Sequence, residues 1–432
     1  MSASRPLTFL FMPESAYGPT NNCIGIGDVL RRAGHRVVFA AEASWKGKLE
    51  ALGFEEDLVD LAPSEGGEAE AGKFWTDFIA ETAPVFRRPT IEQIEHFLAP
   101  TWAALVDGAR FCQAQLEEIL DRHRPDAVIE DNVVAFPALV TAGVPFVRIV
   151  SCNPLEMKGP EVPPAFSGYP AGDRAGWEEF RAEYRRVLLK PWEDFDEWVR
   201  SCGAPALEPL EFIHESTELN LYVYPEVIDY TGRRPLGASW HRLESSVRAT
   251  EGAFEPPEWL RDDGGALVYL SLGSLGSADV GLMSRLVEVL ATTPHRYIVS
   301  KGPLADRYEL ADNMWGAAQV PQTTVLPLVD LAITHGGNNT TTECFHFATP
   351  QVVLPLFWDQ YDNAQRLEET GFGRRLSTYE FEADELVAAI DRLLGDEPLR
   401  RRMAAESERI QAAHGTATAA GLIEEVARAS SP

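Results

Sequence analysis

The turn between residues 334 and 343 constrains the fold of this chain more than any other segment. A short apolar run, residues 331–334, leads directly into Gly336 and Gly337 and then into a polar stretch suited to the start of a helix. A buried strand that turns through glycines into a helix is typical of doubly wound α/β domains. The free N–H groups and the positive dipole end of such a helix attract anions, so the turn predicts a phosphate-binding site.

A second polar segment, residues 354–364, follows this turn. Its Asp359-Gln360 pair and the nearby Asn363 offer carboxylate and amide groups that suit hydroxyls. A phosphate site followed by a hydroxyl-binding segment indicates that the ligand is a nucleotide-sugar.

Together the two segments closely resemble the donor signature of the family 1 glycosyltransferases, bacterial natural-product type, which have the GT-B fold. The family pattern is His-x-Gly-x-Asn-Ser/Thr, then Glu three residues on, then Asp/Glu-Gln before Asn-Ala. The matching residues stand in register: His335, Gly337, Asn339, Thr340, Glu343, Asp359, Gln360, Asn363 and Ala364. The strong resemblance covers residues 265–376, and the first half of the chain matches only weakly.

The resemblance implies a set of donor-binding residues in four segments of the second half. Two further segments contribute to it, because Val320-Pro321-Gln322 resembles the family's nucleobase loop and residues 271–274 resemble the loop after the first donor-domain strand. The expected set is Ser274, Gln319, Val320, Gln322, His335, Gly337, Asn338, Asn339, Thr340, Glu343, Trp358, Asp359 and Gln360.

Each part of the donor has an expected partner within this set. By resemblance, His335 contacts the phosphate next to the sugar, and Gly337, Asn339 and Thr340 at the helix start hold the diphosphate. Glu343 would accept from both ribose hydroxyls, while Asp359 and Gln360 take the sugar hydroxyls beside a wall formed by Trp358. Many relatives stack a Trp on uracil at the position of Gln319, so uridine and thymidine both stay open.

The catalytic base is where the sequence departs from the family. The position of the usual catalytic His falls on Pro19, and proline cannot act as a base. The carboxylate that normally orients this His aligns with Asp131, so we expect Asp131 to be the base, with Glu14 and Glu130 as competitors. The alternative is that Asp131 only caps the following helix. A carboxylate with an ordinary pKa of about 4 is a weak base for an alcohol, which favours late proton transfer or an acidic acceptor such as a phenol.

One further motif concerns metal ions. Asp194-Phe195-Asp196 is an Asp-x-Asp, which metal-dependent glycosyltransferases of another fold use for Mn²⁺ or Mg²⁺. It lies in a charged segment, residues 193–197, far from the glycine turn, and we interpret it as a solvated helix surface. We therefore expect neither a metal nor a cofactor, the nucleotide-sugar being a substrate.

The chain is long enough for two domains of ordinary size, since it has 432 residues. We expect an acceptor-binding Rossmann-like domain at 1–230, a Pro- and Gly-rich linker at 231–265, and a donor-binding Rossmann-like domain at 266–412. In the GT-B fold the C-terminal helix, here 413–432, crosses back to the first domain. Ligands of such domains bind at the carboxyl ends of the parallel strands, so the two domains would face a common cleft.

The net charge limits which partners the protein can bind, and the cysteine content indicates the compartment in which it works. A formal net charge of -28 argues against nucleic acid and anionic membranes. The five cysteines are scattered and odd in number, as is typical of reduced thiols in a cytoplasm. No apolar run approaches the roughly 20 residues that span a bilayer, and the first residues lack a signal-peptide core. The oligomeric state is open, a homodimer included.

The sequence thus predicts an inverting, metal-independent glycosyltransferase that moves a sugar from a UDP- or dTDP-sugar. The acceptor is expected to be a lipophilic small molecule, because the first half carries long Pro/Gly loops and many aromatic residues. Two alternatives remain: a noncatalytic nucleotide-sugar-binding auxiliary protein, which the missing His would favour, and a hydrolase or epimerase of nucleotide-sugars on the same fold. The sugar, the acceptor and the atom it links through are not fixed by the sequence.

Overall fold

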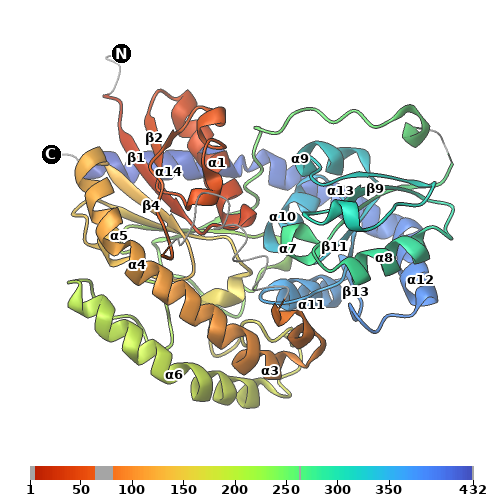
Figure 1. Cartoon of the computed structure of the whole chain (residues 1–432), viewed down its shortest axis with the longest axis horizontal. Helices are drawn as coiled ribbons and strands as arrows, with labels where there is room; N and C mark the ends of the chain where they lie inside the picture. The colour runs from red at the N-terminus through yellow and green to blue at the C-terminus, as the bar shows by residue number, and fades with distance from the viewer. Residues whose placement is uncertain (1–4, 64–80, 262–263, 431–432) are drawn as a thin grey trace.

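The computed structural model describes residues 5–63, 81–261 and 264–430, and it confirms the expected pair of parallel-sheet α/β domains (Figure 1). Among these residues the first sheet has the order β3-β2-β1-β4-β5-β6-β7. Its strands are β1 (Thr8–Pro13), β2 (Arg36–Phe39), β3 (Glu55–Glu56), β4 (Ala127–Asp131), β5 (Phe146–Val150), β6 (Leu219–Val223) and β7 (Trp240–Leu243).

The second sheet has the order β10-β9-β8-β11-β12-β13 within the described part of the chain. Its strands are β8 (Leu267–Ser271), β9 (Arg296–Ser300), β10 (Met314–Ala317), β11 (Leu331–Thr334), β12 (Gln351–Val353) and β13 (Gly373–Arg375). Adjacent strands run parallel in both sheets.

Helices cover both faces of each sheet. Those of the first domain are α1 (Tyr17–Arg32), α3 (Thr90–Gln93), α4 (Ala99–His123), α5 (Pro137–Val140) and α6 (Trp177–Ser201), with one π-helical turn, η4 (Ile94–Leu98), and short turns η1 (Ala43–Trp45), η2 (Glu50–Leu52), η3 (Ala83–Arg87), η5 (Pro154–Met157) and η6 (Glu226–Ile228). Those of the second are α7 (Gly273–Gly276), α8 (Val280–Leu290), α9 (Gln322–Val325), α10 (Asn338–His346), α11 (Gln360–Thr370), α12 (Ala383–Leu394) and α13 (Glu397–Ala412), with η7 (Glu258–Arg261), η8 (Ala305–Arg307) and η9 (Leu326–Leu328).

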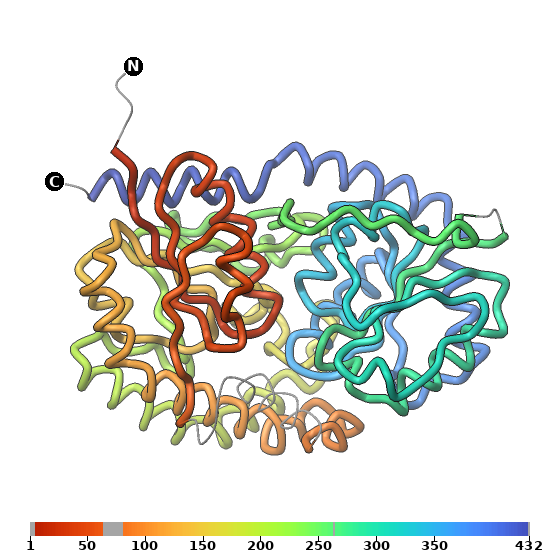
Figure 2. The backbone as a smooth tube through the Cα atoms, turned by 45° about the horizontal axis from the view of Figure 1, so that its top comes forward, coloured from red at the N-terminus to blue at the C-terminus, as the bar shows by residue number. Residues whose placement is uncertain are grey.

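The C-terminal helix α14 (Gly415–Ala429) belongs to the first domain although it follows the second in sequence. It packs on α1, β4, β6 and β7, and its Ala419 and Ile423 share an apolar core with Phe9 of β1. Figure 2 shows α13 and α14 running along one side of both domains. The chain therefore crosses between the domains twice, once before β8 and once between α13 and α14. Residues 240–243, which the sequence places in the linker, form the edge strand β7 of the first sheet.

The strand order reverses direction between β1 and β4 in one sheet and between β8 and β11 in the other. Pro13 pairs with Asp131 at the first of these points, and Ser271 pairs with Thr334 at the second. In open α/β sheets the crevice outside the carboxyl ends of the strands at such a point is the usual ligand site. The two crevices are thus set by topology at residues that the sequence singles out.

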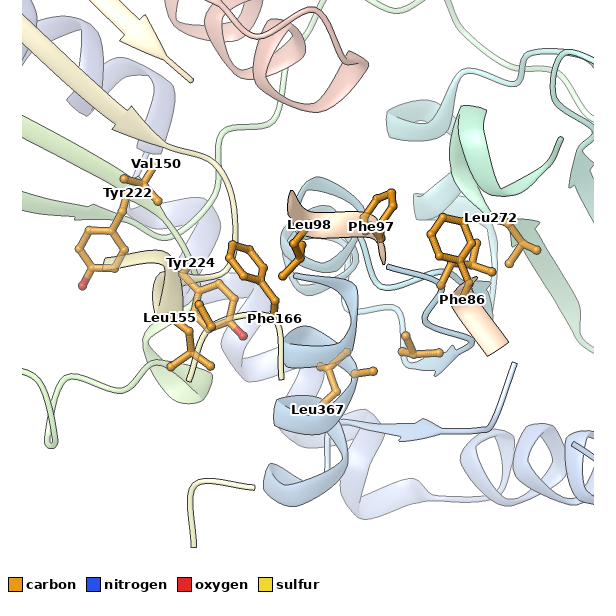
Figure 3. Packing of buried hydrophobic residues seen from close by; sticks show 14 of the residues in the cluster. Phe86, Phe97, Leu98, Val150, Leu155, Phe166, Tyr222, Tyr224, Leu272 and Leu367 are labelled. Atoms are coloured by element: carbon orange, nitrogen blue, oxygen red, sulfur yellow. The ribbon is translucent and has the colours of Figure 1, made fainter. Parts of the chain in front are cut away.

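An apolar core joins the two domains. The ring of Phe357, after β12, stacks on Phe86 with centroids 4.9 Å apart, and Trp358 lies 4.7 Å from Phe166 by the same measure. Figure 3 shows residues of this cluster from both domains, with Phe86 and Phe166 of the first near Leu272 and Leu367 of the second. Burial of these rings stabilises the association of the two domains.

Candidate active site

The phosphate-binding turn has the conformation that its glycines predict. Gly336 has a φ of 83°, in the left-handed region, and its N–H donates to Thr334 Oγ1 over 3.1 Å. A Cβ at this position would lie 2.7 Å from Val353 Cγ1 and 3.0 Å from the carbonyl oxygen of Gln360, so only glycine fits. Gly337 is the N-cap of α10, and no side chain of the described residues caps this helix start. The first N–H groups of α10 are therefore available to an anion.

His335 is clamped between two glycine turns. A Cβ on Gly273 would lie 2.8 Å from its Cε1, and one on Gly337 would lie 2.5 Å from its Nε2. Its Nδ1 is buried and has no hydrogen-bond partner among the described residues. Burial lowers the pKa of His335 to about 4, with only a partial offset from the carbonyl of Ser271. The ring is therefore neutral near pH 7 and offers one N–H donor rather than a positive charge.

The side chains at the start of α10 contact the first domain. Asn338 Nδ2 donates to the carbonyls of Ser151 and Val223, each over 2.9 Å. Asn339 Nδ2 donates to the Gly18 carbonyl over 2.8 Å, and its Oδ1 accepts from Asn22 of α1 over 2.9 Å. The resemblance places both residues in the donor-binding set and assigns Asn339 to the diphosphate, whereas in this structure the two amides join the domains and leave backbone N–H groups at the helix start for an anion.

The expected ribose contact, Glu343, is a buried carboxylate with two partners. Its Oε2 accepts from Gln322 Nε2 over 2.6 Å, and the same amide lies 3.2 Å from Thr340 Oγ1. Its Oε1 accepts from Arg248 Nη1 over 2.7 Å. Gln322 and Thr340 are members of the predicted set. Arg248 is not, because it lies in the interdomain segment and belongs to no recognisable motif.

The hydroxyl-binding segment lies directly against the phosphate turn. Asn363 Nδ2 donates to the Gly336 carbonyl over 2.9 Å, which fixes α11 beside the turn. Gln360 Oε1 accepts from the N–H groups of Leu356 and Phe357, and this orients its amide. The structure thus brings together two motifs that are separated in sequence.

Asp359 is tied to the first domain in the same region. Its Oδ2 accepts from the N–H of Asn153 over 2.8 Å, and burial raises the pKa of the Asp359 carboxyl to about 7. Trp358 has a φ of 57° and packs on the first-domain rings Trp102 and Phe166. Asn153, which also donates to Asn363 Oδ1 over 2.7 Å, has no sequence signal beyond its place in a Pro- and Gly-rich loop.

The nucleobase loop and the first donor-domain loop stand at the edge of the same crevice. Gln319 is exposed and its amide donates to the hydroxyl of Tyr17 of α1 over 3.3 Å. Val320 is half-buried, and Ser274 is exposed on α7 next to the glycine that contacts His335. The contact of Gln319 with Tyr17 brings the first domain to this loop, and the donor roles of Gln319, Val320 and Ser274 stay predictions.

Asp131 ends β4 in the first-domain crevice and is 2% exposed. Its Oδ1 accepts from the hydroxyl of Ser151 over 2.7 Å, while Oδ2 is buried and makes no hydrogen bond among the described residues, although the side chain of Asn22 lies close enough to favour the ionised form. Burial raises the pKa of Asp131 to about 8, although the hydroxyl of Ser151 opposes the rise. A buried carboxyl with one anchored and one free oxygen is suited to accept a proton from a hydroxyl placed against it.

The competing carboxylates are less suited to that task. Both oxygens of Glu14 are engaged at the start of α1, one with the hydroxyl of Ser15 and one with the N–H of Ala16. Glu130 precedes Asp131 on β4, so its side chain points to the opposite face of the sheet. It is fully buried, and burial raises its pKa well above the usual range. Pro19 lies in the first turn of α1, and Asn22, one turn on, faces Asn339.

The Asp-x-Asp motif has local partners on helix α6. Asp194 pairs with Lys190 over 2.6 Å, and Asp196 accepts from Arg200 and from the N–H of Leu207. Asp194 is exposed, as expected, but the expectation of a solvated surface is wrong for Asp196, which is buried because its carboxylate binds the neighbouring loop. In the described residues, no helix is long and apolar enough to cross a membrane.

Comparisons with known proteins agree with this geometry. Residues 284–423 match the family model for the C-terminal domain of proteins like erythromycin biosynthesis protein CIII. The oleandomycin glycosyltransferase of Streptomyces antibioticus is 27% identical over 423 residues, which cover 95% of this chain and 88% of that protein. The solved structure of the kitacinnamycin glycosyltransferase has a TM-score of 0.70 at 23% identity, covering 98% of this chain and 99% of its own. The glycosyltransferase VinC in complex with dTDP has a TM-score of 0.66 at 18% identity, covering 98% and 100%.

Proposed function

We infer from these matches that the chain is a family 1 glycosyltransferase of the GT-B fold, natural-product type, and from this premise we propose that it transfers a sugar from a dTDP- or UDP-sugar to a lipophilic small-molecule acceptor. We propose further that the transfer inverts the anomeric carbon and needs no metal ion. The observation that carries the proposal is the meeting of two crevices. Asn338 and Asn339, at the anion-binding helix start, hydrogen-bond to Ser151 and Asn22, the two residues beside Asp131.

The chemistry follows from what each crevice offers. The acceptor hydroxyl would lie against the free Oδ2 of Asp131, with the anomeric carbon of the donor between it and α10. The acceptor O–H bond breaks and its proton passes to Asp131, while the acceptor oxygen forms a bond to the anomeric carbon. The bond from that carbon to the phosphate oxygen breaks on the opposite side, and the nucleoside diphosphate leaves with the electron pair. Attack from the side opposite the leaving group inverts the anomeric centre.

The leaving diphosphate is stabilised by the start of α10 and by His335. Backbone N–H groups aimed at developing negative charge in a site without water are worth several kcal/mol, and they need no reorganisation during the reaction. The neutral His335 adds one hydrogen bond. A phosphate placed beside this ring would raise its pKa, since an opposite charge favours the protonated form. These groups supply what a divalent cation supplies in other glycosyltransferases.

The environment of Asp131 explains how this carboxylate can replace the catalytic histidine that relatives have at the position of Pro19. Proton transfer is most effective when the pKa of the base lies near the working pH, and burial raises the pKa of Asp131 to about 8. This carboxylate is therefore a stronger base than an exposed one, and an ordinary alcohol acceptor becomes reasonable as well as a phenol. It also weakens the case for a noncatalytic auxiliary protein, which rested on the absence of a base.

One sequence position bears on whether the donor carries uridine or thymidine. Gln319 stands where many relatives place the Trp that stacks on uracil, so the site does not demand uridine. The complex of VinC with dTDP supports a thymidine donor for this chain as well. We propose that both dTDP- and UDP-sugars serve as donors.

A transfer assay tests the proposal. The purified protein is incubated with dTDP-glucose or UDP-glucose, with and without a panel of lipophilic alcohols and phenols, and release of the nucleoside diphosphate is followed together with the glycoside by mass spectrometry. Release that requires an acceptor and matches glycoside formation supports the proposal. Equal release without acceptor would indicate a hydrolase, and a converted but intact nucleotide-sugar would indicate an epimerase. Binding without turnover would indicate an auxiliary protein.

A further inference from the structure

A buried ion pair links the interdomain segment to the nucleotide crevice. Arg248 Nη1 donates to Glu343 Oε1 over 2.7 Å, and the two residues are 8% and 2% exposed. Arg248 Nη2 binds Glu251, which in turn accepts from the N–H and the hydroxyl of Thr323 over 2.8 and 2.7 Å. Thr323 lies in the first turn of α9, beside the nucleobase loop. The Arg248 side chain is therefore fixed at both ends of its guanidinium fork.

The backbone of Arg248 rests on the first domain. A Cβ at Gly25 of α1 would lie 3.5 Å from the Cα of Arg248 and 3.2 Å from Thr416 of α14. The guanidinium thus reaches from a platform made by α1 and α14 into the second domain. An arginine in this place adds a positive charge to a crevice that must hold an anion in a protein of net charge -28.

Glu343 keeps acceptor capacity after both of its partners are counted. Its Oε1 accepts from Arg248, and its Oε2 accepts from Gln322 over 2.6 Å. An ionised carboxylate has about four acceptor sites, so each oxygen retains one for a further donor. A carboxylate this deeply buried is costly unless it is paired, and it takes up a proton when the pair is lost.

We propose that Arg248 is a positioning residue for the donor nucleotide: it keeps the Glu343 carboxylate charged and oriented so that its remaining acceptor sites bind the two ribose hydroxyls. The proposal rests on the proposed function, because it takes Glu343 as the ribose contact. A purely structural salt bridge would affect stability alone. The Arg248–Glu343 pair should instead make the protein prefer nucleotides that carry ribose hydroxyls.

The proposal also predicts a change in pH dependence. The groups that face Glu343 are Arg248 and Glu251 from the interdomain segment, Gln322 and Thr340 from α9 and α10, and Tyr269 from β8, with Cys344 beside it in sequence. Burial raises the pKa of Glu343 and the Arg248 guanidinium is the largest influence that opposes the rise. Without Arg248, Glu343 binds a proton at higher pH, so nucleotide affinity is lost as the pH falls through the new, higher pKa.

The experiment measures binding of UDP, 2′-deoxy-UDP and 2′,3′-dideoxy-UDP by calorimetry, which varies the hydroxyls and keeps the base and the diphosphate. In the wild type each hydroxyl should improve affinity roughly tenfold or more, as expected for a hydrogen bond to a charged acceptor. In Arg248→Met the three nucleotides should bind with nearly equal affinity at pH 6, and the advantage of UDP should return partly as the pH rises. Arg248→Lys should restore most of the wild-type pattern, since it restores the charge.

Two controls separate the possible outcomes. Arg234→Met removes another buried arginine, which pairs with Asp229 in the first domain, and it should leave the order of affinities unchanged. On a Glu343→Gln background, Arg248→Met should have no further effect on any of the three nucleotides. This double variant removes both charges together, so it remains informative if Arg248→Met alone does not fold.

Each result has a distinct meaning. A wild type that binds none of the three nucleotides refutes the proposed function itself. A wild type that binds them, with Arg248→Met keeping the same preference for hydroxyls, refutes the role of Arg248. Equal weakening of all three nucleotides by Arg248→Met on the Glu343→Gln background would also refute it, because Arg248 would then act directly on the diphosphate.

Discussion

Replacement of Asp131 by asparagine should abolish most of the transferase activity. It should also remove the rise of kcat/KM with pH that ionisation of Asp131 produces. The substitution nearly preserves shape and hydrogen bonding but removes basicity, so a helix-capping role would survive it and a base role would not. General-base catalysis is typically worth about 10²- to 10⁴-fold, and we expect a loss in kcat/KM within that range.

The pH dependence follows from the buried carboxyl. The base acts in its ionised form, and burial raises the pKa of Asp131 to about 8. Activity should therefore fall as the pH drops below that value. With this pKa about one tenth of the enzyme is ionised at pH 7 and about nine tenths at pH 9, so kcat/KM should rise roughly tenfold between them. Because Glu14 and Glu156 also influence Asp131, the measured value belongs to the group of carboxyls rather than to one of them.

Ser151 provides an independent test of the same assignment. Its hydroxyl donates to Asp131 Oδ1 over 2.7 Å and so favours the ionised form. A hydrogen bond to a charged group is worth about 1.5–3 kcal/mol, which corresponds to roughly one to two pKa units. Ser151→Ala should therefore shift the acid limb of the kcat/KM profile to higher pH by about that amount.

The assay is a discontinuous measurement of the initial rate of glycoside formation from pH 6 to 10. The matched control is the Asp194→Asn variant. Asp194 pairs with Lys190 on α6, and its replacement should leave the profile unchanged. The reasoning is refuted if the Asp131→Asn variant turns over at close to the wild-type rate, or if its kcat/KM still rises with pH as in the wild type.

The remaining predictions concern the donor site and the domain contact. His335→Ala should fold normally, as judged by circular dichroism, yet lose about 10²- to 10³-fold in rate, and near-normal turnover would remove it from the site. Activity should survive dialysis against EDTA, and an activity that needed added Mn²⁺ would contradict the role of α10. Glu14→Gln should retain most activity, because its oxygens are engaged at the start of α1; loss of activity there, with an active Asp131→Asn, would transfer the base role to Glu14. Asn338→Ala should lower the melting temperature by several degrees, since it leaves two buried carbonyls of the first domain unpaired, and an unchanged melting temperature would show that this contact is weak.

Much of the second domain was predictable because its strands are continuous apolar runs. The apolar runs at residues 267–270, 296–299 and 331–334 predict strands, and they correspond to β8, β9 and β11, which are each longer by no more than one residue. Other strands gave no such signal. β6 contains Asn220, whose side chain is satisfied by Ser216, and β13 is Gly-Arg-Arg, paired with β12 through backbone groups that are independent of residue type. Tertiary pairing, not local propensity, makes these segments strands.

The helix α1 shows a different limit. The sequence suggests a helix from Cys23, but α1 begins at Tyr17 and carries Pro19 in its first turn, a position where proline is tolerated. Its start lies in the Pro/Gly segment that resembles a loop.

For the site, the sequence predicted segments that the fold brings together, but not the partners of their side chains. Asn338 and Asn339 lie at the helix start as expected, yet their amides contact residues of the other domain, which a motif within one domain does not encode. No sequence motif indicated a role for Arg248, because it lies in an irregular interdomain segment. The raised pKa of Asp131 depends on burial by elements far apart in sequence, so it was not visible beforehand.

A crystal structure of the protein with dTDP and an acceptor alcohol tests the central claim most directly. The account predicts the diphosphate against the backbone N–H groups of the first turn of α10 and the ring of His335, the 3′-hydroxyl of the deoxyribose at Glu343, and the acceptor hydroxyl within hydrogen-bond distance of Asp131 Oδ2. A diphosphate bound away from α10, or an acceptor hydroxyl facing another carboxylate or a water far from Asp131, would contradict it.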